Sequence, residues 1–587
     1  MSVTEILALA RRQQVELFVE GDALRYRAYG TPLSAELRQR LTVEKAAIIA
    51  FLRDHKQALP VRRADLDDAP AVLTQAQQRM YFLHQAEGDG SQCNMAFAFD
   101  IEGQIAEERL ETAIRAVIQR HAVLRTVYDN RDGALCQIQR PASDFRLVLS
   151  AAATAEEAEE VVRQQSAASF SLRTDLPLRV TLIRFAPGRS KLSLVFHHIA
   201  FDGWSYQLFL SELSMEMAGH IPPVPPFQIA DIARQQDQAA TDAAKLGYWQ
   251  NRLSGAEPLN GLSPDRARSG GAEYTPASCT TRLDHILTRD LAAAAQQNGI
   301  TVFEFLQASF GAVVARWTGR THAIIGTPVA GRGHPAFDRM IGLFVNTLPV
   351  RIDIPPANSL SDFLILSAER FRADLVHQDV PFDAIVAAVI ATRDPSYPPL
   401  VQIFFAMNEA EEDHLSIPGV KAVARLAPRT TVNFELELHV TLTPEGAELD
   451  WHFAENLFDQ ATIRLLAESY EAFLRDALAR PDAPVGQLTV VSDSDLSRLE
   501  AWSGALVAPM ASKDFSERFS DWARATPGRV ACFDDSTQWS YAELDTRSRH
   551  VAAALQASGV HAGDLVGLAV DRNLSMILGI LAILRAG

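Results

Sequence analysis

A histidine pair, His197 and His198, is followed after three residues by Asp202 and Gly203. An imidazole takes up or gives up a proton near neutral pH, so either ring is suited to accept a proton or a hydrogen bond from a reacting group. Asp202 is spaced to hold the loop that follows the pair. Gly203 permits a backbone turn that other residues make only at a cost. These four residues form the candidate catalytic set.

The residues before the pair predict the strand that positions it. Residues 192–196 form an apolar run typical of a buried strand, and residues 178–185 form a second run. Between them, residues 186–190 contain Pro and Gly and predict a turn. Successive side chains of a strand point to opposite faces. If the strand continues to the pair, one ring is held by the interior while the other faces a cavity.

Two other interpretations fit a histidine pair at the end of a strand. Both rings can simply be satisfied within a core. A metal site is the second possibility, but it needs a third and a fourth ligand at recognisable spacing. No Cys or His cluster lies near His197 and His198. We therefore predict no metal site.

Composition limits the classes of protein to which this chain can belong. Its 587 residues predict several domains, and 48% hydrophobic with 22% charged residues is typical of soluble globular proteins. The net charge of −17 leaves no basic surplus for nucleic acid. The four cysteines form no CxxC pair, and no basic segment followed by an apolar core opens the chain. The longest apolar run, residues 576–584, is too short to cross a bilayer. We expect a cytoplasmic protein without a membrane partner.

The string HHxxxDG, followed here by Trp204 and Ser205, resembles the active-site motif of nonribosomal peptide synthetase condensation domains. Those domains belong to the chloramphenicol-acetyltransferase-like superfamily. Further stretches resemble the other signatures of that family, in the family's order. Ala122 and Asp383 are mild departures from the pattern. The stretches are residues 73–83, 120–128, 227–231, 341–347, 377–383 and 393–400.

The resemblance implies a fold and a reaction. The fold is α/β, with two chloramphenicol-acetyltransferase-like lobes in a V. The reaction is peptide-bond formation in secondary metabolism, between an upstream carrier-bound acyl or peptidyl thioester and the α-amine of a carrier-bound aminoacyl thioester. The domain itself binds no cofactor. Donor and acceptor carrier proteins present their substrates on 4′-phosphopantetheine arms.

The resemblance also implies roles for individual residues. His198 is expected to act on the amine, either as a base or by positioning it through a hydrogen bond, and His197 is expected to be structural. Asp202 is expected to form a structural salt bridge with Arg332. The N–H of Gly203 is a candidate donor to the tetrahedral oxyanion. Candidates for lining the substrate tunnel are Trp204, for which ordinary packing is an equal alternative, Ser205 and Asn346.

Residues 1–60 predict a separate small α+β module with the order helix, hairpin, helix, helix. This module resembles TubC-type docking domains, in which a hairpin edge receives the C-terminal tail of an upstream synthetase subunit as an added strand. It holds nine basic and seven acidic residues, in contrast to the rest of the chain. Arg25 and Arg27 share a strand face and are candidates for holding carboxylates of that tail. Alternatively, they are part of a solvated surface.

The predicted boundaries divide the chain into five parts. Residues 1–60 are the docking domain and 61–70 a linker. Residues 71–490 are the condensation domain, with an N-lobe at 71–240 and a C-lobe at 241–490. Residues 491–514 are a second linker. Residues 515–587 resemble the truncated start of an adenylation domain and lack that family's Gly-rich phosphate loop, so this segment is not expected to activate an amino acid. The downstream adenylation domain of the same chain is an expected partner.

Several alternative functions stay open at this point. An epimerization domain shares HHxxxDG but follows a carrier protein, whereas this body precedes an adenylation start. A dual epimerization/condensation domain carries a His-rich string near its first signature, where this chain has His84 and then Gly88-Asp89. A cyclization domain is disfavoured because its motif replaces the histidines by Asp. The remaining alternative is a non-catalytic docking scaffold.

Overall fold

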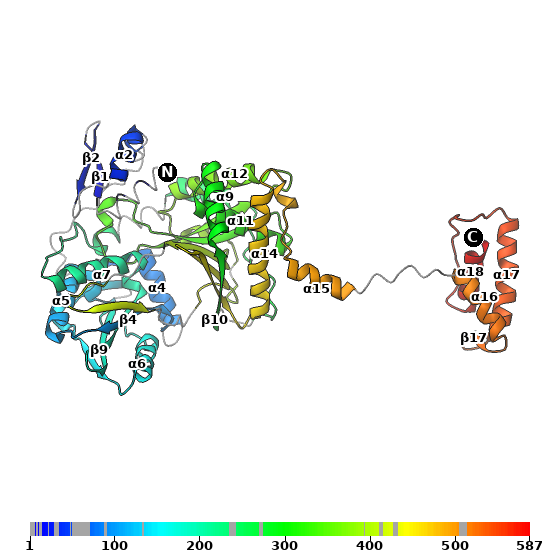
Figure 1. Cartoon of the computed structure of the whole chain (residues 1–587), viewed down its shortest axis with the longest axis horizontal. Helices are drawn as coiled ribbons and strands as arrows, with labels where there is room; N and C mark the ends of the chain where they lie inside the picture. The colour runs from blue at the N-terminus through cyan, green and yellow to red at the C-terminus, as the bar shows by residue number, and fades with distance from the viewer. Residues whose placement is uncertain are drawn as a thin grey trace. The chain divides into compact units, whose positions relative to one another are not determined.

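The structure is a computed structural model, and it separates into two compact units, Met1–Ser492 and Asp493–Gly587 (Figure 1). The residues described are 6, 10, 15–20, 23–28, 35–46, 48–49, 71–86, 91–131, 134–233, 242–268, 274–392, 394–409, 415–425, 432–503 and 514–587. The predicted linker at 61–70 lies outside them.

The N-terminal segment contains the predicted hairpin. Strand β1, Val15–Glu20, pairs antiparallel with β2, Ala23–Ala28. Helix α2, Ala35–Val43, follows. Apolar side chains of the hairpin and the helix form one small core, because alternate residues of β1 point to the same face as Leu24 of β2. Its buried members are Val15, Leu17, Leu37 and Leu41, together with Ile6, Ala10 and Ile48 from outside these three elements.

The N-lobe is built on a five-stranded sheet with the order β14-β4-β9-β8-β7. Strand β9, Arg189–His197, lies at its centre, between β8, Leu178–Ala186, and β4, Asn94–Glu102. The edges are β7, Val148–Ala151, and β14, Lys421–Arg425. The last of these comes from the C-terminal half of the sequence and pairs with β4, so distant parts of the chain share this sheet.

Helices cover both faces of the N-lobe sheet (Figure 1). Helix α5, Glu107–Arg120, and α7, Gly203–Ala218, pack on the face that carries Phe99. Helix α6, Ala155–Ala167, packs on the opposite face, against Ala98. The alternation of side chains along β4 thus separates two cores. A small sheet, β3-β6-β5, lies beside them, and helix α4, Gln75–Ala86, follows its first strand. Its strands are β3, Ala71–Val72, β5, Thr126–Arg131, and β6, Ala134–Gln139.

The C-lobe is a second α/β layer structure. Its six-stranded sheet has the order β10-β16-β15-β13-β11-β12. The strands are β10, Pro276–Asp284; β11, His322–Val329; β12, Asn346–Asp353; β13, Ile403–Glu409; β15, Leu436–Thr443; and β16, Gly446–Ala454. The helices are α9, Ala243–Arg252; α10, His285–Gln297; α11, Val302–Thr318; α12, Leu360–Val376; α13, Phe382–Val389; and α14, Gln460–Ala479.

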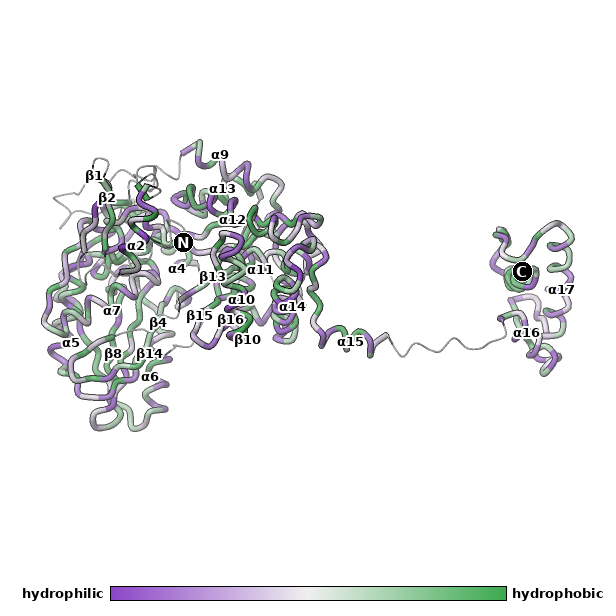
Figure 2. The backbone as a smooth tube through the Cα atoms, turned by 45° about the horizontal axis from the view of Figure 1, so that its top comes forward, coloured by the Kyte–Doolittle hydropathy of each residue, from purple (hydrophilic) through white to green (hydrophobic). Residues whose placement is uncertain are grey.

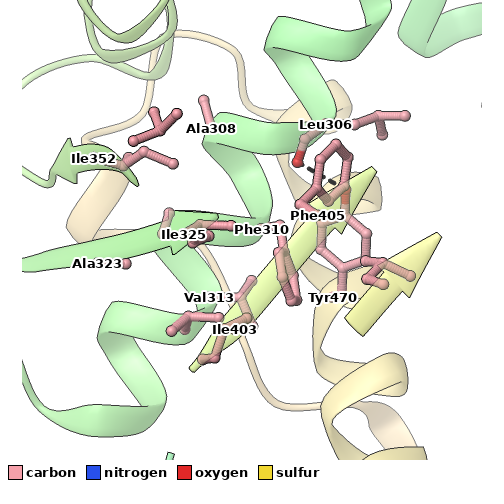
Figure 3. Packing of buried hydrophobic residues seen from close by; sticks show 14 of the residues in the cluster. Leu306, Ala308, Phe310, Val313, Ala323, Ile325, Ile352, Ile403, Phe405 and Tyr470 are labelled. Carbon is pink, nitrogen blue, oxygen red and sulfur yellow. Dashed lines mark hydrogen bonds between the residues drawn. The ribbon is translucent and has the colours of Figure 1, made fainter. Parts of the chain in front are cut away.

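Helix α11 differs from its sequence-based prediction. Residues 301–317 predict an amphipathic helix, but every residue from Glu304 to Ala315 is buried. The helix therefore runs through the core of the C-lobe, where Phe310 packs between Phe405 of β13 and Tyr470 of α14 (Figure 3). The hydroxyl of Tyr470 donates to the carbonyl of Leu306 at 2.9 Å. By contrast, α14 changes between hydrophilic and hydrophobic residues along its length (Figure 2), as expected for a covering helix.

The second unit begins with helix α15, Asp493–Ser503. After residues 504–513, which are not described, a small α/β body contains helices α16, Phe515–Ala525, α17, Tyr541–Ala557, and α18, Leu574–Ala586. A two-stranded sheet joins β17, Val530–Phe533, to β18, Gln538–Ser540.

Within the described parts of the chain, no single helix has the length and apolar composition needed to cross a membrane. The bent pair α10 and α11 meets the length and composition criteria only when its members are taken together. Both of these helices supply buried residues to the hydrophobic core of the C-lobe.

Candidate active site

The histidine pair lies where the central strand of the N-lobe ends. His197 is the last residue of β9, and His198 opens a short 3-10 turn, His198–Ala200. Helix α7 starts at Gly203, with Asp202 as its N-cap. The Asp202 carboxylate accepts the backbone N–H of Ser205 at 2.8 Å. The predicted strand end thus leads through a tight turn into a capped helix.

His197 is held entirely by the interior. Its residue surface is 0% exposed, and its Nδ1 accepts the N–H of Ile199 at 3.1 Å. A neutral ring with an accepting Nδ1 carries its proton on Nε2. Nε2 lies 3.2 Å from Nδ1 of His84, so it donates to that nitrogen. Burial, with the neighbouring His84 and His198, lowers the pKa of His197 to about 3.

His198 is oriented differently and keeps partial solvent access. Its Nδ1 lies 2.6 Å from the carbonyl oxygen of Phe201. A carbonyl only accepts, so Nδ1 carries the proton and the lone pair of the neutral ring is on Nε2. Burial lowers the pKa of His198, although the Phe201 carbonyl and Asp202 act in the opposite direction. Near neutral pH this ring is uncharged and presents Nε2 as an acceptor.

Asp202 and Arg332 form a buried ion pair between the two lobes. Nη2 of Arg332 lies 3.2 Å and 3.4 Å from the two carboxylate oxygens, with side chains 1% and 3% exposed. The guanidinium also donates to the carbonyls of Phe337 and Met340 at 2.5 Å and 2.7 Å. It lies 4.0 Å from the centroid of the Phe344 ring. The charge is therefore surrounded by acceptors and an aromatic face.

A C-lobe segment closes around this pair. The N–H of Phe344 donates to the Asp202 carboxylate at 3.0 Å. Gly331, next to Arg332, has φ +64°, and a Cβ atom there would lie 1.9 Å from the Phe344 carbonyl oxygen. Only glycine fits such a close backbone approach in that conformation. Asp202 thus holds its own loop and the facing C-lobe segment together.

The structure corrects the prediction that Ser205 lines a substrate tunnel. Ser205 is 0% exposed. Its hydroxyl donates to Asp202 at 2.7 Å and accepts the N–H of Gly342 at 3.0 Å and Nη2 of Arg332 at 3.2 Å. A hydroxyl with these partners supports the ion pair and cannot reach a substrate. In the sequence, Ser205 is the second residue after the motif, and that position alone does not show which face of the helix it occupies.

The other two residues predicted to line the tunnel are also engaged in the protein. Nε1 of Trp204 donates to the carbonyl of Asp338 at 2.9 Å, which ties the start of α7 to the C-lobe. Asn346 uses both amide hydrogens on the carbonyls of Gln378 and Val380, at 2.9 Å and 2.8 Å. Its oxygen accepts the N–H of Phe382 at 3.1 Å. These contacts leave Asn346 no side-chain donor for a substrate.

Gly203 lies at the first position of α7 and is exposed. A Cβ atom at Gly203 would meet no heavy atom within 4 Å. The backbone there borders open space, and a helix N-terminus favours negative charge.

Helix α4 contributes residues that sequence reasoning did not assign to the site. Nε2 of Gln77 donates to the hydroxyl of Tyr128 at 3.2 Å and to the carbonyl of Ile199 at 3.4 Å. His84, in the last turn of the same helix, contacts His197. The spacing of seven residues places Gln77 and His84 on one helix face. That spacing, which runs from the first signature stretch at 73–83 to the residue just after it, was the available signal.

The predicted docking arginines lie on β2. Arg25 is exposed, whereas the side chain of Arg27 lies outside the described residues. In the hairpin Arg25 is opposite Phe18, and Arg27 is opposite Glu16. Among the residues that the structure describes, no group of three or more His, Cys, Asp or Glu side chains is arranged to hold a metal ion.

Comparisons with known proteins agree with this architecture. The family model described as "Condensation domain" matches residues 69–499. The models "TubC N-terminal docking domain" and "AMP-binding enzyme" match residues 3–54 and 519–587. Because the first match covers most of the chain, this protein belongs to the condensation-domain family of nonribosomal peptide synthetases.

The relatives are large synthetases. Malpinin synthetase of Mortierella alpina is 30% identical over 94% of this chain, which covers 7% of that protein. Phosphinothricin tripeptide synthetase PhsB of Streptomyces viridochromogenes is 30% identical over 90% of this chain and 46% of its own length. The chain thus spans less than half of either relative.

Solved structures support the predicted condensation-domain fold. A four-domain nonribosomal peptide synthetase, holo-AB3403 bound to AMP and glycine, has TM-score 0.70 at 21% identity, over 90% of this chain and 41% of its own. The X-domain in complex with OxyB from teicoplanin biosynthesis has TM-score 0.68 at 24% identity. The match covers 74% of this chain and 99% of that chain. The predicted fold class, chloramphenicol-acetyltransferase-like lobes with an N-terminal docking module, is confirmed.

Proposed function

We propose that this chain joins two carrier-bound substrates by an amide bond. The donor is an acyl or peptidyl thioester on an upstream carrier, and the acceptor is the α-amine of an aminoacyl thioester on a second carrier. The observation that carries the proposal is the orientation of His198. Its Nδ1 is bound to the Phe201 carbonyl, which directs the lone pair on Nε2 away from the turn. A neutral imidazole presented in this way suits an amine nucleophile.

The reaction needs orientation more than covalent catalysis. The amine nitrogen attacks the thioester carbonyl carbon, and a C–N bond forms while the carbonyl becomes an oxyanion. Collapse of this intermediate breaks the C–S bond. The nitrogen loses one proton, and the leaving thiolate gains one. Nε2 of His198 accepts a hydrogen bond or the proton from the nitrogen, and holding the two reactants together contributes about 7–11 kcal/mol.

The remaining groups of the site support this geometry. We assign the N–H of Gly203 to the oxyanion, since it lies at a helix N-terminus beside open space. Asp202, Ser205 and Arg332 hold the turn and the facing lobe, and His197 is structural. Phosphopantetheine arms on the two carriers deliver the substrates. The condensation domain itself needs no cofactor for these steps.

We also propose the division of the chain into the predicted parts, 1–60, 61–70, 71–490, 491–514 and 515–587. Residues 1–60 dock the C-terminal tail of an upstream subunit, with Arg25 and Arg27 holding its carboxylates. Residues 515–587 begin an adenylation domain that supplies the acceptor amino acid. We place the reaction in the cytoplasm, because the four cysteines form no pattern typical of disulfides.

A single-turnover assay tests the proposal. The chain is mixed with a donor carrier and an acceptor carrier that are both loaded with aminoacyl thioesters, and the carriers are then analysed by mass spectrometry. Amide product on the acceptor carrier is the expected result. A donor that is racemised without amide formation would assign the chain to epimerization. Loaded carriers that stay unchanged would assign it to a docking scaffold.

A further inference from the structure

His84 lies outside the histidine motif in the sequence, yet it contacts the motif in the fold. It is in the last turn of α4, 113 positions before His197. The two rings meet edge to face, with centroids 5.0 Å apart and planes at 71°. His84 Nδ1 lies 3.2 Å from His197 Nε2. This contact joins a helix of the N-lobe to the end of the central strand.

The direction of the hydrogen bonds follows from His197. Its Nδ1 accepts the N–H of Ile199, so in the neutral ring the proton is on Nε2. A buried donor needs an acceptor, and Nδ1 of His84 is that acceptor. On another side, the Phe170 ring stands edge-on to His197, with centroids 5.9 Å apart. His84 therefore satisfies the one buried donor that the imidazole of His197 carries.

The position of that proton decides the shape of the catalytic turn. If His197 carried the proton on Nδ1, this N–H would face the N–H of Ile199, and two donors would oppose each other. The 3-10 turn would then lose its cap, which is the bond from the Ile199 N–H to His197. This turn begins at His198, so its opening would displace the catalytic ring.

We propose that His84 is a positioning residue for His198. It fixes the protonated nitrogen of His197, and His197 in turn holds the 3-10 turn that orients His198. This inference deepens the proposed function and rests on it. His84 does not touch the reacting atoms in this account, and it acts through His197.

The matched variants are His84→Leu, His84→Asn and Gln85→Leu. Leu removes the acceptor, whereas the Asn oxygen has the position and the accepting ability to replace Nδ1. Gln85 is exposed on the same helix, so its change to Leu controls for altered helix composition.

The first readout needs no substrate. Nitrogen NMR of the histidine-labelled full chain reports which ring nitrogen of His197 carries the proton. We expect Nε2–H in the wild type and in His84→Asn, and a shifted or mixed signal in His84→Leu. Wild-type protein with the proton on Nδ1 would overturn the inference, even if no variant folded.

The second readout is the single-turnover amide assay, with loaded donor and acceptor carriers at rising concentration. For His84→Leu we expect a maximal rate lower by roughly tenfold to a hundredfold, the range for a displaced reacting group, with an unchanged half-saturating carrier concentration. His84→Asn should restore most of the rate. A wild-type rate in His84→Leu, or equal losses in both variants, would overturn the role of His84. Absence of amide with wild-type protein would instead refute the proposed function, and the NMR result would still be interpretable.

Discussion

Arg332 of the C-lobe donates to both carboxylate oxygens of Asp202 in the N-lobe, at 3.2 Å and 3.4 Å, and both side chains are almost fully buried. The same carboxylate caps α7 and accepts the N–H of Phe344. A residue of the histidine motif is thus a structural link between the lobes. The motif combines the proposed role of His198 with the packing that holds this ring in place.

Replacement of Asp202 by Ala should lower the free energy of unfolding by about 3–5 kcal/mol, because Arg332 would be left as a buried charge without its partner. We expect reduced soluble yield together with lost activity. Denaturant unfolding measures the effect. The double variant Asp202→Ala with Arg332→Met should recover part of the loss, since it removes both charges. A stable Asp202→Ala protein that has lost only rate would contradict the structural role.

The sequence predicted this ion pair only through resemblance, because its partners are 130 positions apart in the chain. The strands at 178–185 and 192–196 followed directly from apolar runs and a Pro-Gly turn. Sequence reasoning failed for α11 and Ser205. Local periodicity does not show that a helix will be covered on all sides, nor which face of α7 is turned inward. The contact between His84 and His197 depends on tertiary packing alone.

Ser205→Ala should destabilise the protein by about 1–3 kcal/mol, because Arg332 and the N–H of Gly342 would each lose a buried acceptor. Thermal or denaturant unfolding checks this value. Ser169→Ala is the matched control, since Ser169 is exposed in the same lobe. If Ser205→Ala were as stable as the control but impaired in carrier-dependent turnover, Ser205 would have to be assigned to the substrate after all.

The pH dependence of amide formation should follow His198. Burial lowers the pKa of this ring from its ordinary value of 6.5. Protonation of Nε2 removes the acceptor, so activity is present above the lowered pKa and is lost as the pH falls through it. The acceptor α-amine titrates separately, at about pH 7.7–8, so we expect His198 to add a second acidic step, below pH 6.5, to the ratio of the rate constant to the half-saturating carrier concentration. A step above pH 6.5 that is present in the wild type and absent in His198→Ala would show that His198 is charged in the free protein.

Reversal of charge on the hairpin should weaken docking. The variant Arg25→Glu with Arg27→Glu places like charge opposite an acidic partner tail, and we expect a lower affinity that depends on salt concentration. Isothermal titration with the tail peptide of the upstream subunit measures it. Arg38→Glu, an exposed change on α2, serves as the control. Equal affinity in the hairpin variant and the wild type would remove both arginines from the docking surface.

The central claim is that His198 presents Nε2 to an amine that attacks a carrier-bound thioester. Its most direct test is the single-turnover yield of amide in the wild type and in His198→Ala, with loaded donor and acceptor carriers and with unfolding curves for both proteins. The account predicts an equally folded variant whose rate is lower by about 10²–10⁴-fold, the usual contribution of a positioned proton acceptor. Amide formation at the wild-type rate by a folded His198→Ala protein would contradict it.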